Sequence, residues 1–169
     1  LNASSSTLRD PDFCDHLFNI ADAHGIAPAN ITVEVLENIV LHDGDEEAVL
    51  TVKKLSKAGF TIAIDAFGVG YSSLSRISSL AVSAIKIDRS LTLQAGKESM
   101  DKILAATAAM AKGLNVALFA EGIETEKQRV AMKALGVEVG QGFLWARPMA
   151  LADLQTWIRS EQFRTLRAV

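Results

Sequence analysis

Successive apolar runs of the sequence each lead into polar side chains suited to catalysis or metal binding. These side chains are Glu34 after residues 31–33, Asp65 after 60–64, Lys86 and Asp88 around Ile87, Glu121 after 115–120, and Gln141 after Val139. A charged group at the buried end of a strand is costly unless it is paired or bound to an ion, so the repeated pattern requires an explanation. Carboxylate oxygens are hard ligands that select magnesium, manganese or calcium rather than zinc. The pattern therefore predicts a divalent-cation site built from the carboxylates.

Softer metals and nucleophilic catalysis are not indicated. His16, His24 and His42 stand at unrelated spacings, and Cys14 is the single cysteine. Each histidine is therefore interpreted as an ordinary surface or core residue. No serine or cysteine has an evident histidine partner, and the GxSxG hydrolase motif is absent.

The most distinctive segment runs from Asp65 to Leu74 with the sequence DAFGVGYSSL. Gly68 and Gly70 permit positive φ and the close approach of a ligand, and Ser72 or Ser73 could cap a following helix whose N-terminus would attract an anion. The spacing matches neither the dinucleotide-binding fingerprint nor a P-loop. Phosphate binding and a plain strand-to-helix turn both remain open at this point.

Strand and helix patterns alternate along the whole chain. We expect strands at 31–33, 60–64, 84–87, 115–119 and 139–144, and helices over 10–25, around 49–55, over 125–135 and over 151–159. This order predicts an α/β fold of parallel strands with helical crossovers, either a doubly wound sheet or a (β/α) barrel. In both, polar groups gather at the carboxyl ends of the strands. No linker divides residues 1–169, which we interpret as one domain or part of one.

The amino-acid composition further restricts the class of protein and its expected partners. The 169 residues are 49% hydrophobic and carry 17 basic against 20 acidic side chains, for a net charge of −3. This profile is typical of a soluble globular protein, and without a basic cluster we expect no duplex nucleic acid as a partner. Lys112 interrupts the longest Ala-rich stretch, so no membrane contact is expected. A lone cysteine indicates a reducing, cytoplasmic compartment.

Together the motifs resemble the EAL family of bacterial cyclic di-GMP phosphodiesterases and receptors. The matching pieces, in family order, are Asn2-Ala3-Ser4 for NxS, Glu34-Val35-Leu36-Glu37 for EITE, 65–74 for DDFGTGYSSL, Lys86-Ile87-Asp88 for KID, 120–124 for AEGVE, and Gln141-Gly142-Phe143 for QGY. The resemblance runs from Asn2 to about Pro148. It implies a modified TIM (β/α)8 barrel.

The resemblance also implies a reaction and the roles of individual residues. The reaction is hydrolysis of one phosphodiester bond of cyclic di-GMP, with Mg2+ or Mn2+ as cofactor. By analogy, the metal ligands are Asn2, Glu34, Asp65 and Glu121, the catalytic residues are Lys86, Glu121 and Gln141, and the loop or substrate residues are Glu37, Gly68, Tyr71 and Asp88. Lys86 would lie beside the nucleophilic water, Gln141 would help hold the site, and Glu37 would anchor the 65–74 loop.

Two departures from the family pattern matter. The namesake Glu-Ala-Leu motif is absent, and the length is short of the roughly 250 residues of a typical barrel, so we expect a partial EAL domain lacking about its first two strands. Such a piece would expose two unpaired edges unless upstream or partner strands fill the opening. Ala66 replaces the second Asp of DDFG, a ligand of the second metal, and a methyl group cannot coordinate.

Three functions therefore remain open: an active or weakened phosphodiesterase, a degenerate receptor that binds cyclic di-GMP without cutting it, and a scaffold without a ligand. The resemblance further implies a homodimer coupled to the site through the 65–74 loop. An upstream sensory or GGDEF-type domain is the expected covalent partner.

Overall fold

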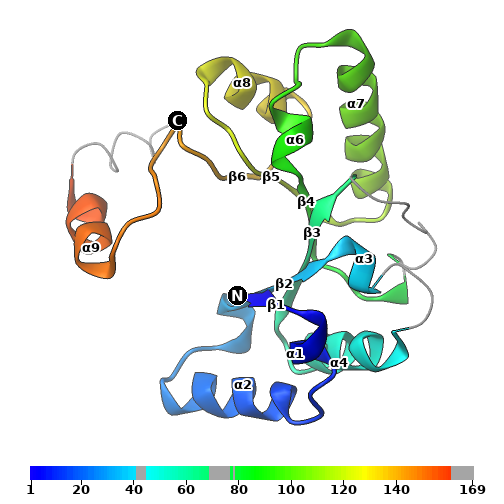
Figure 1. The fold of residues 1–169 in the computed structure, drawn as a ribbon, viewed down its shortest axis with the longest axis vertical. Coiled ribbons are helices and arrows are strands. Elements are labelled where there is room, and N and C mark those ends of the chain that lie inside the picture. The colour runs from blue at the N-terminus through cyan, green and yellow to red at the C-terminus, as the bar shows by residue number, and fades with distance from the viewer. Residues whose placement is uncertain (41–44, 69–76, 78, 161–169) are drawn as a thin grey trace.

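Six parallel strands form one open sheet in the computed structural model, which describes residues 1–40, 45–68, 77 and 79–160. The strands are β1 (Asn2–Ala3), β2 (Thr32–Leu36), β3 (Thr61–Phe67), β4 (Ala84–Ile87), β5 (Ala117–Ala120) and β6 (Val139–Gly140). They lie side by side in chain order, so β1 and β6 are the edges of the described sheet (Figure 1). The predicted alternation of strands and crossovers is confirmed.

Helices connect the strands. They are α1 (Ser5–Leu8), α2 (Phe13–Ala23), the 3-10 helix η1 (Pro28–Asn30), α3 (Glu37–Val40), α4 (Glu46–Lys57), α6 (Arg89–Thr92), α7 (Glu98–Gly113), α8 (Glu126–Ala134) and α9 (Leu151–Arg159). None of the helices in the described ranges is long and apolar enough to cross a membrane. The four expected helices therefore form, as α2, α4, α8 and α9. The additional helices in the described ranges are the long α7, the short α1, α3 and α6 that follow strands, and η1.

Some predicted boundaries were wrong, for local reasons. The first long helix begins at Phe13 rather than Asp10, because the Asp10 carboxylate accepts a hydrogen bond from the Asp12 amide (2.9 Å) in a turn before the helix. Strand β5 begins at Ala117 because Asn115 adopts φ +55°, which breaks extended structure. Strand β6 ends at Gly140 instead of continuing to residue 144.

The two faces of the sheet differ in what they bury. Ile62, Ile64, Ile85 and Ile87 have essentially no exposed surface and belong to one apolar core with residues of α4 and α7, including Leu55. Successive side chains of a strand point to opposite faces. Lys86, between Ile85 and Ile87, and Asp65, directly after Ile64, therefore face the other side of the sheet.

Helix α8 begins with the predicted capping box, in which Thr125 accepts from the Gln128 amide and the Gln128 side chain accepts from the Thr125 amide.

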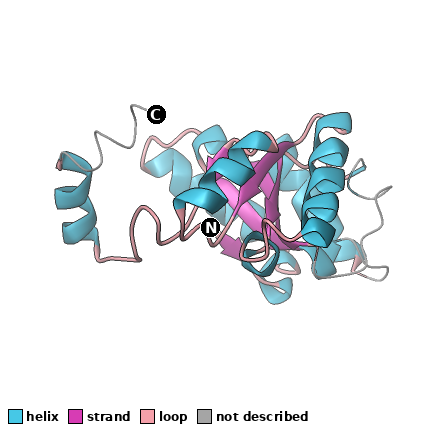
Figure 2. Cartoon of the chain, turned by 90° about the horizontal axis from the view of Figure 1, so that it is seen from above, coloured by secondary structure: helices cyan, strands magenta, loops and turns pink. Residues whose placement is uncertain are grey.

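The end of the chain is arranged differently from the rest. Helix α9 lies apart from the sheet in both views (Figures 1 and 2). It contains no buried residue, and Leu151 is 70% exposed. The compact part of the described structure therefore ends before α9.

Candidate metal centre at the carboxyl ends of the strands

Three carboxylates, two on strands and one directly after a strand, meet on the polar face of the sheet. Glu34, Asp65 and Glu121 each offer one oxygen, and these oxygens lie within 4.8 Å of one another. Glu34 is in the middle of β2, Asp65 is inside β3, and Glu121 follows β5. The sequence placed Glu34 and Asp65 beyond the ends of their strands, which was wrong. Both strands continue past these acids.

Glu34, Asp65 and Lys86 lie on one face of the sheet because of the strand register and because side chains alternate between the two faces. Glu34 pairs with Ala63 on β3, and Ala63 pairs with Ala84 on β4. Asp65 and Lys86 each lie two residues further along and therefore point to the same face as Glu34. A polar residue inside a strand is thus tolerated, because its apolar neighbours serve the opposite, helix-covered face.

Lys86 is the cation at the centre of this cluster. Its Nζ atom lies 2.7 Å from Glu34 Oε2, 3.2 Å from Asp65 Oδ1 and 2.5 Å from Glu121 Oε1. The Lys86 side chain is only 5% exposed, while those of the acids are 19–27% exposed. Burial alone would lower the pKa of Lys86, but hydrogen bonds to Glu121 and Glu34 and the charge of Asp65 outweigh it and raise that pKa. Lys86 is therefore an ammonium at neutral pH.

The chemistry of the cluster suits a divalent cation. One ammonium cannot neutralise three carboxylates, so the cluster keeps an excess of negative charge. Asp65 Oδ1 is buried and makes no hydrogen bond within the described part of the chain, although Lys86 Nζ lies within ion-pairing distance. A buried carboxylate oxygen without a hydrogen bond is costly, and coordination to a hard cation would satisfy it. The residues present therefore fit such an ion.

Asn2, the other predicted ligand, and the predicted loop residues Glu37 and Gly68 have defined partners in the structure. Asn2 on β1 is the register partner of Glu34, which places it on the polar face beside that acid. Glu37 is 4% exposed, and its Oε2 accepts a hydrogen bond from the Gly68 amide (2.9 Å). The structure thus joins the end of β2 to the start of the 65–74 loop. Tyr71 lies outside the described residues, as do Gly70, Ser72 and Ser73.

Two further predicted residues lie at the same rim. Gln141 directly follows β6 and, with Glu121, lines a hollow of about 190 Å³. Asp88 caps α6 by accepting a hydrogen bond from the Ser90 amide (2.7 Å). It is not among the three carboxylates that come together, and its observed contact is that of an ordinary helix cap.

Sequence reasoning missed the neighbours of Glu121 and the shape of the chain around Asp65. Arg89 lines the same hollow and pairs with Glu124 (Nη2 to Oε1, 2.7 Å). Ala66 adopts φ +55° at an irregularity in the β3–β4 pairing. Asp and Asn occupy this left-handed region more readily than other non-glycine residues. The signal that could have predicted this conformation is the Asp that the family pattern has at position 66, where this sequence has Ala.

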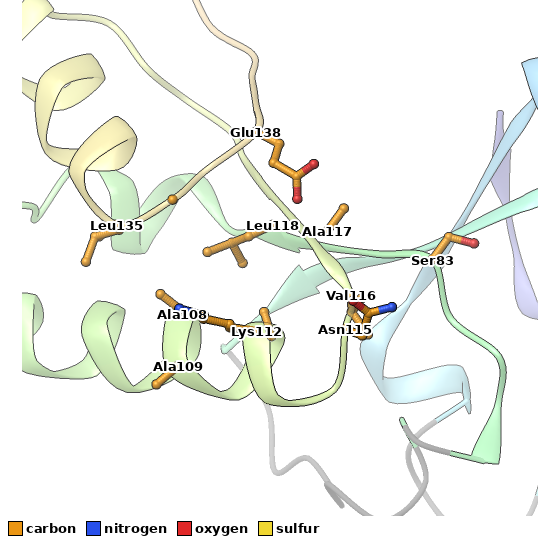
Figure 3. A pocket seen from close by; sticks show the side chains of 12 residues that line it. Ser83, Ala108, Ala109, Lys112, Asn115, Val116, Ala117, Leu118, Leu135 and Glu138 are labelled. Carbon is orange, nitrogen blue, oxygen red and sulfur yellow. The ribbon is translucent and has the colours of Figure 1, made fainter.

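Another hollow, of about 580 Å³, lies at the opposite ends of the strands (Figure 3). It is bordered by residues that precede β4, β5 and β6, namely Ser83, Asn115 and Glu138, and by the alanines of α7. The side chain of Leu118, from β5, points toward the side of the hollow that carries Leu135 and Ala108 (Figure 3). None of the residues that line it belongs to the acidic cluster, so we do not include it in the candidate site.

The fold and the cluster together define a class: α/β proteins with a parallel sheet whose polar face carries an acidic centre suited to hard cations. The sequence profile of the EAL domain family matches residues 1–148. The chain belongs to the EAL domain family, and the six strands that the structure describes are part of that family's modified TIM barrel.

Individual relatives give the same assignment. The cyclic di-GMP phosphodiesterase NbdA of Pseudomonas aeruginosa is 32% identical over 164 residues, which cover 96% of this chain and 21% of NbdA. A solved structure of the PaMucR phosphodiesterase in complex with c-di-GMP has a TM-score of 0.84 at 34% identity, covering 90% of this chain and 68% of that chain. A manganese and cyclic di-GMP complex of Klebsiella pneumoniae BlrP1 has a TM-score of 0.77 at 30% identity, covering 88% and 38%. The chain spans about a fifth of the length of the curated relatives it matches.

Proposed function

We propose that this chain is part of a metal-dependent phosphodiesterase that hydrolyses cyclic di-GMP to the linear dinucleotide pGpG in bacterial second-messenger signalling. The observation that carries the proposal is the meeting of Glu34, Asp65 and Glu121 around Lys86. The names of the relatives support the substrate, and the manganese complex of one of them supports the cofactor class.

The residues divide the work as follows. Glu34, Asp65 and Glu121 would hold Mg2+ or Mn2+, with the Asn2 amide oxygen as a further donor. When bound, such an ion lowers the pKa of coordinated water and stabilises charge on phosphoryl oxygens. Because the pKa of Lys86 is raised, its ammonium supplies positive field at the site and is not the base. Gln141 would help to orient the substrate from the rim.

A hydrolysis assay tests the proposal. We expect the full-length protein to convert cyclic di-GMP to the linear dinucleotide in manganese, because the three carboxylates are all present. Addition of EDTA should stop product formation, and the Glu34→Ala variant is the control for contaminating activity. Product no greater than that of the variant would end the proposal of catalysis.

A second candidate is a receptor that binds cyclic di-GMP without cutting it, and Ala66 favours it. The methyl group of Ala66 cannot coordinate, so a second cation would have one ligand fewer than in the family pattern. Calorimetry in EDTA distinguishes the candidates: micromolar binding without turnover in manganese supports the receptor, and no binding excludes it.

We expect the Ala66→Asp variant to raise manganese-dependent turnover at least tenfold. The new carboxylate would restore the missing ligand, and the positive φ at this position suits Asp better than Ala. Initial rates at saturating cyclic di-GMP over a manganese titration measure the effect. Unchanged rates would show that the second cation does not limit this protein. The Ala66→Gly variant is the control, since glycine accepts the positive φ but offers no ligand atom.

A further inference from the structure

Two loops at the rim of the sheet are joined by a pair of backbone hydrogen bonds. The Ile123 amide, just beyond β5, donates to the Gln141 carbonyl oxygen (3.1 Å), and the Leu144 amide donates to the Ile123 carbonyl oxygen (3.0 Å). Ile123 is itself 1% exposed and belongs to the core. One fixed residue of the β5 loop therefore holds residues 141–144 from both of its backbone groups.

Gly142 lies inside this clamp. A Cβ atom at Gly142 would overlap the carbonyl oxygen and the amide nitrogen of Ile123 and lie 2.6 Å from its carbonyl carbon. These are backbone atoms of a buried residue, so they cannot move aside as the end of a flexible side chain would. Gly142 is not among the glycines with positive φ. Glycine is therefore required at position 142 because there is no room for a Cβ atom, and not because of the backbone conformation.

The clamp lies between two residues of the candidate site. Glu121, which contacts Lys86, precedes Ile123 by two positions, and Gln141 directly precedes Gly142. Glu121, Gln141 and Gly142 line the same hollow of about 190 Å³. A displacement of a few tenths of an ångström between the two loops would change the distance between Glu121 and Gln141.

We propose that Gly142 is a positioning residue, which by its lack of a side chain lets Ile123 hold Gln141 in place opposite Glu121. The proposal rests on the proposed function for its kinetic consequence. Catalysis depends steeply on the placement of such groups, so a loosened loop lowers the rate without removing any functional side chain.

Kinetics of the full-length protein test this role. We expect Gly142→Ala to lower kcat for cyclic di-GMP by about tenfold to a hundredfold. The matched control is Gly113→Ala, which adds the same methyl group where no atom lies within 4 Å and φ is not positive. Its kcat should stay within twofold of wild type.

A double-mutant cycle separates positioning from a general structural role. If Gly142 acts through Gln141, then adding Gly142→Ala to the Gln141→Ala variant should lower kcat by less than a further threefold. The side chain that Gly142 positions is already absent from that variant. Multiplicative losses would overturn the proposal.

Hydrogen exchange provides a readout that does not depend on activity. In the wild type, the Ile123 and Leu144 amides should be protected together, and Gly142→Ala should speed exchange of both at least tenfold, with the amides of β4 unchanged. If either wild-type amide exchanges freely, or if the variant leaves both protected, the clamp is refuted even where the variant folds poorly. Absence of turnover in the wild type with a protected clamp would instead count against the proposed function alone.

Discussion

Replacement of Glu121 by glutamine should lower manganese-dependent turnover of cyclic di-GMP about a thousandfold. The change removes one of three carboxylates whose oxygens lie within 4.8 Å of one another, while it keeps the size of the side chain. A cation held by these carboxylates supplies several kcal/mol of transition-state stabilisation, and a loss of about 4 kcal/mol corresponds to a thousandfold in rate. The loss should appear both in kcat and in the manganese concentration required for half-maximal rate.

The matched control is Glu138→Gln, which makes the same change on an exposed residue at the opposite ends of the strands. Its turnover should equal that of the wild type. Melting temperatures of both variants check that the fold is retained. If Glu121→Gln keeps more than a tenth of wild-type activity, Glu121 is not a metal ligand and the centre must be assigned differently.

Replacement of Lys86 by methionine should destabilise the metal-free protein by about 2–3 kcal/mol. Removing one partner of a buried ion pair typically costs about 3–5 kcal/mol, and we reduce this because the three acids are 19–27% exposed. The remaining carboxylates would repel one another without a cation between them. Urea unfolding in EDTA measures the loss.

Magnesium distinguishes this charge effect from a packing defect. Because the variant has lost its internal cation, magnesium should stabilise Lys86→Met more than it stabilises the wild type. The control is Lys102→Met, at a lysine that is 73% exposed in a pair with Glu98, and it should change stability by less than about 0.5 kcal/mol. Equal stabilisation of wild type and Lys86→Met by magnesium would show that Lys86 does not balance the cluster.

The stability supplied by Lys86 has a defined pH window. Folding raises the pKa of Lys86 above its ordinary value of 10.5, so the contribution is fully present below that pH and is lost only as the pH rises further. Titration of Lys86 should therefore leave the difference in the free energy of unfolding between wild type and Lys86→Met nearly constant around neutral pH.

Local sequence patterns predict those features whose contacts lie close together in the chain. The capping box at Thr125 and Gln128 was predictable because all its contacts lie within four residues. The helix over 151–159 was predicted with its observed bounds for the same reason. The strand expected over 139–144 stops at Gly140, and the chain beyond it makes backbone hydrogen bonds with Ile123, a residue of another loop.

The site divides in the same way. The sequence by itself determined which side chains carry the chemistry, their order along the chain, the family, and the departure at Ala66, since these depend only on residue type and spacing. Only the tertiary structure decided that Glu34 and Asp65 lie inside strands, that Lys86 joins three acids, and that Gly142 sits in a clamp. These are contacts between residues distant in the chain, and their distances are set by strand register and by the alternation of faces, which no single segment contains.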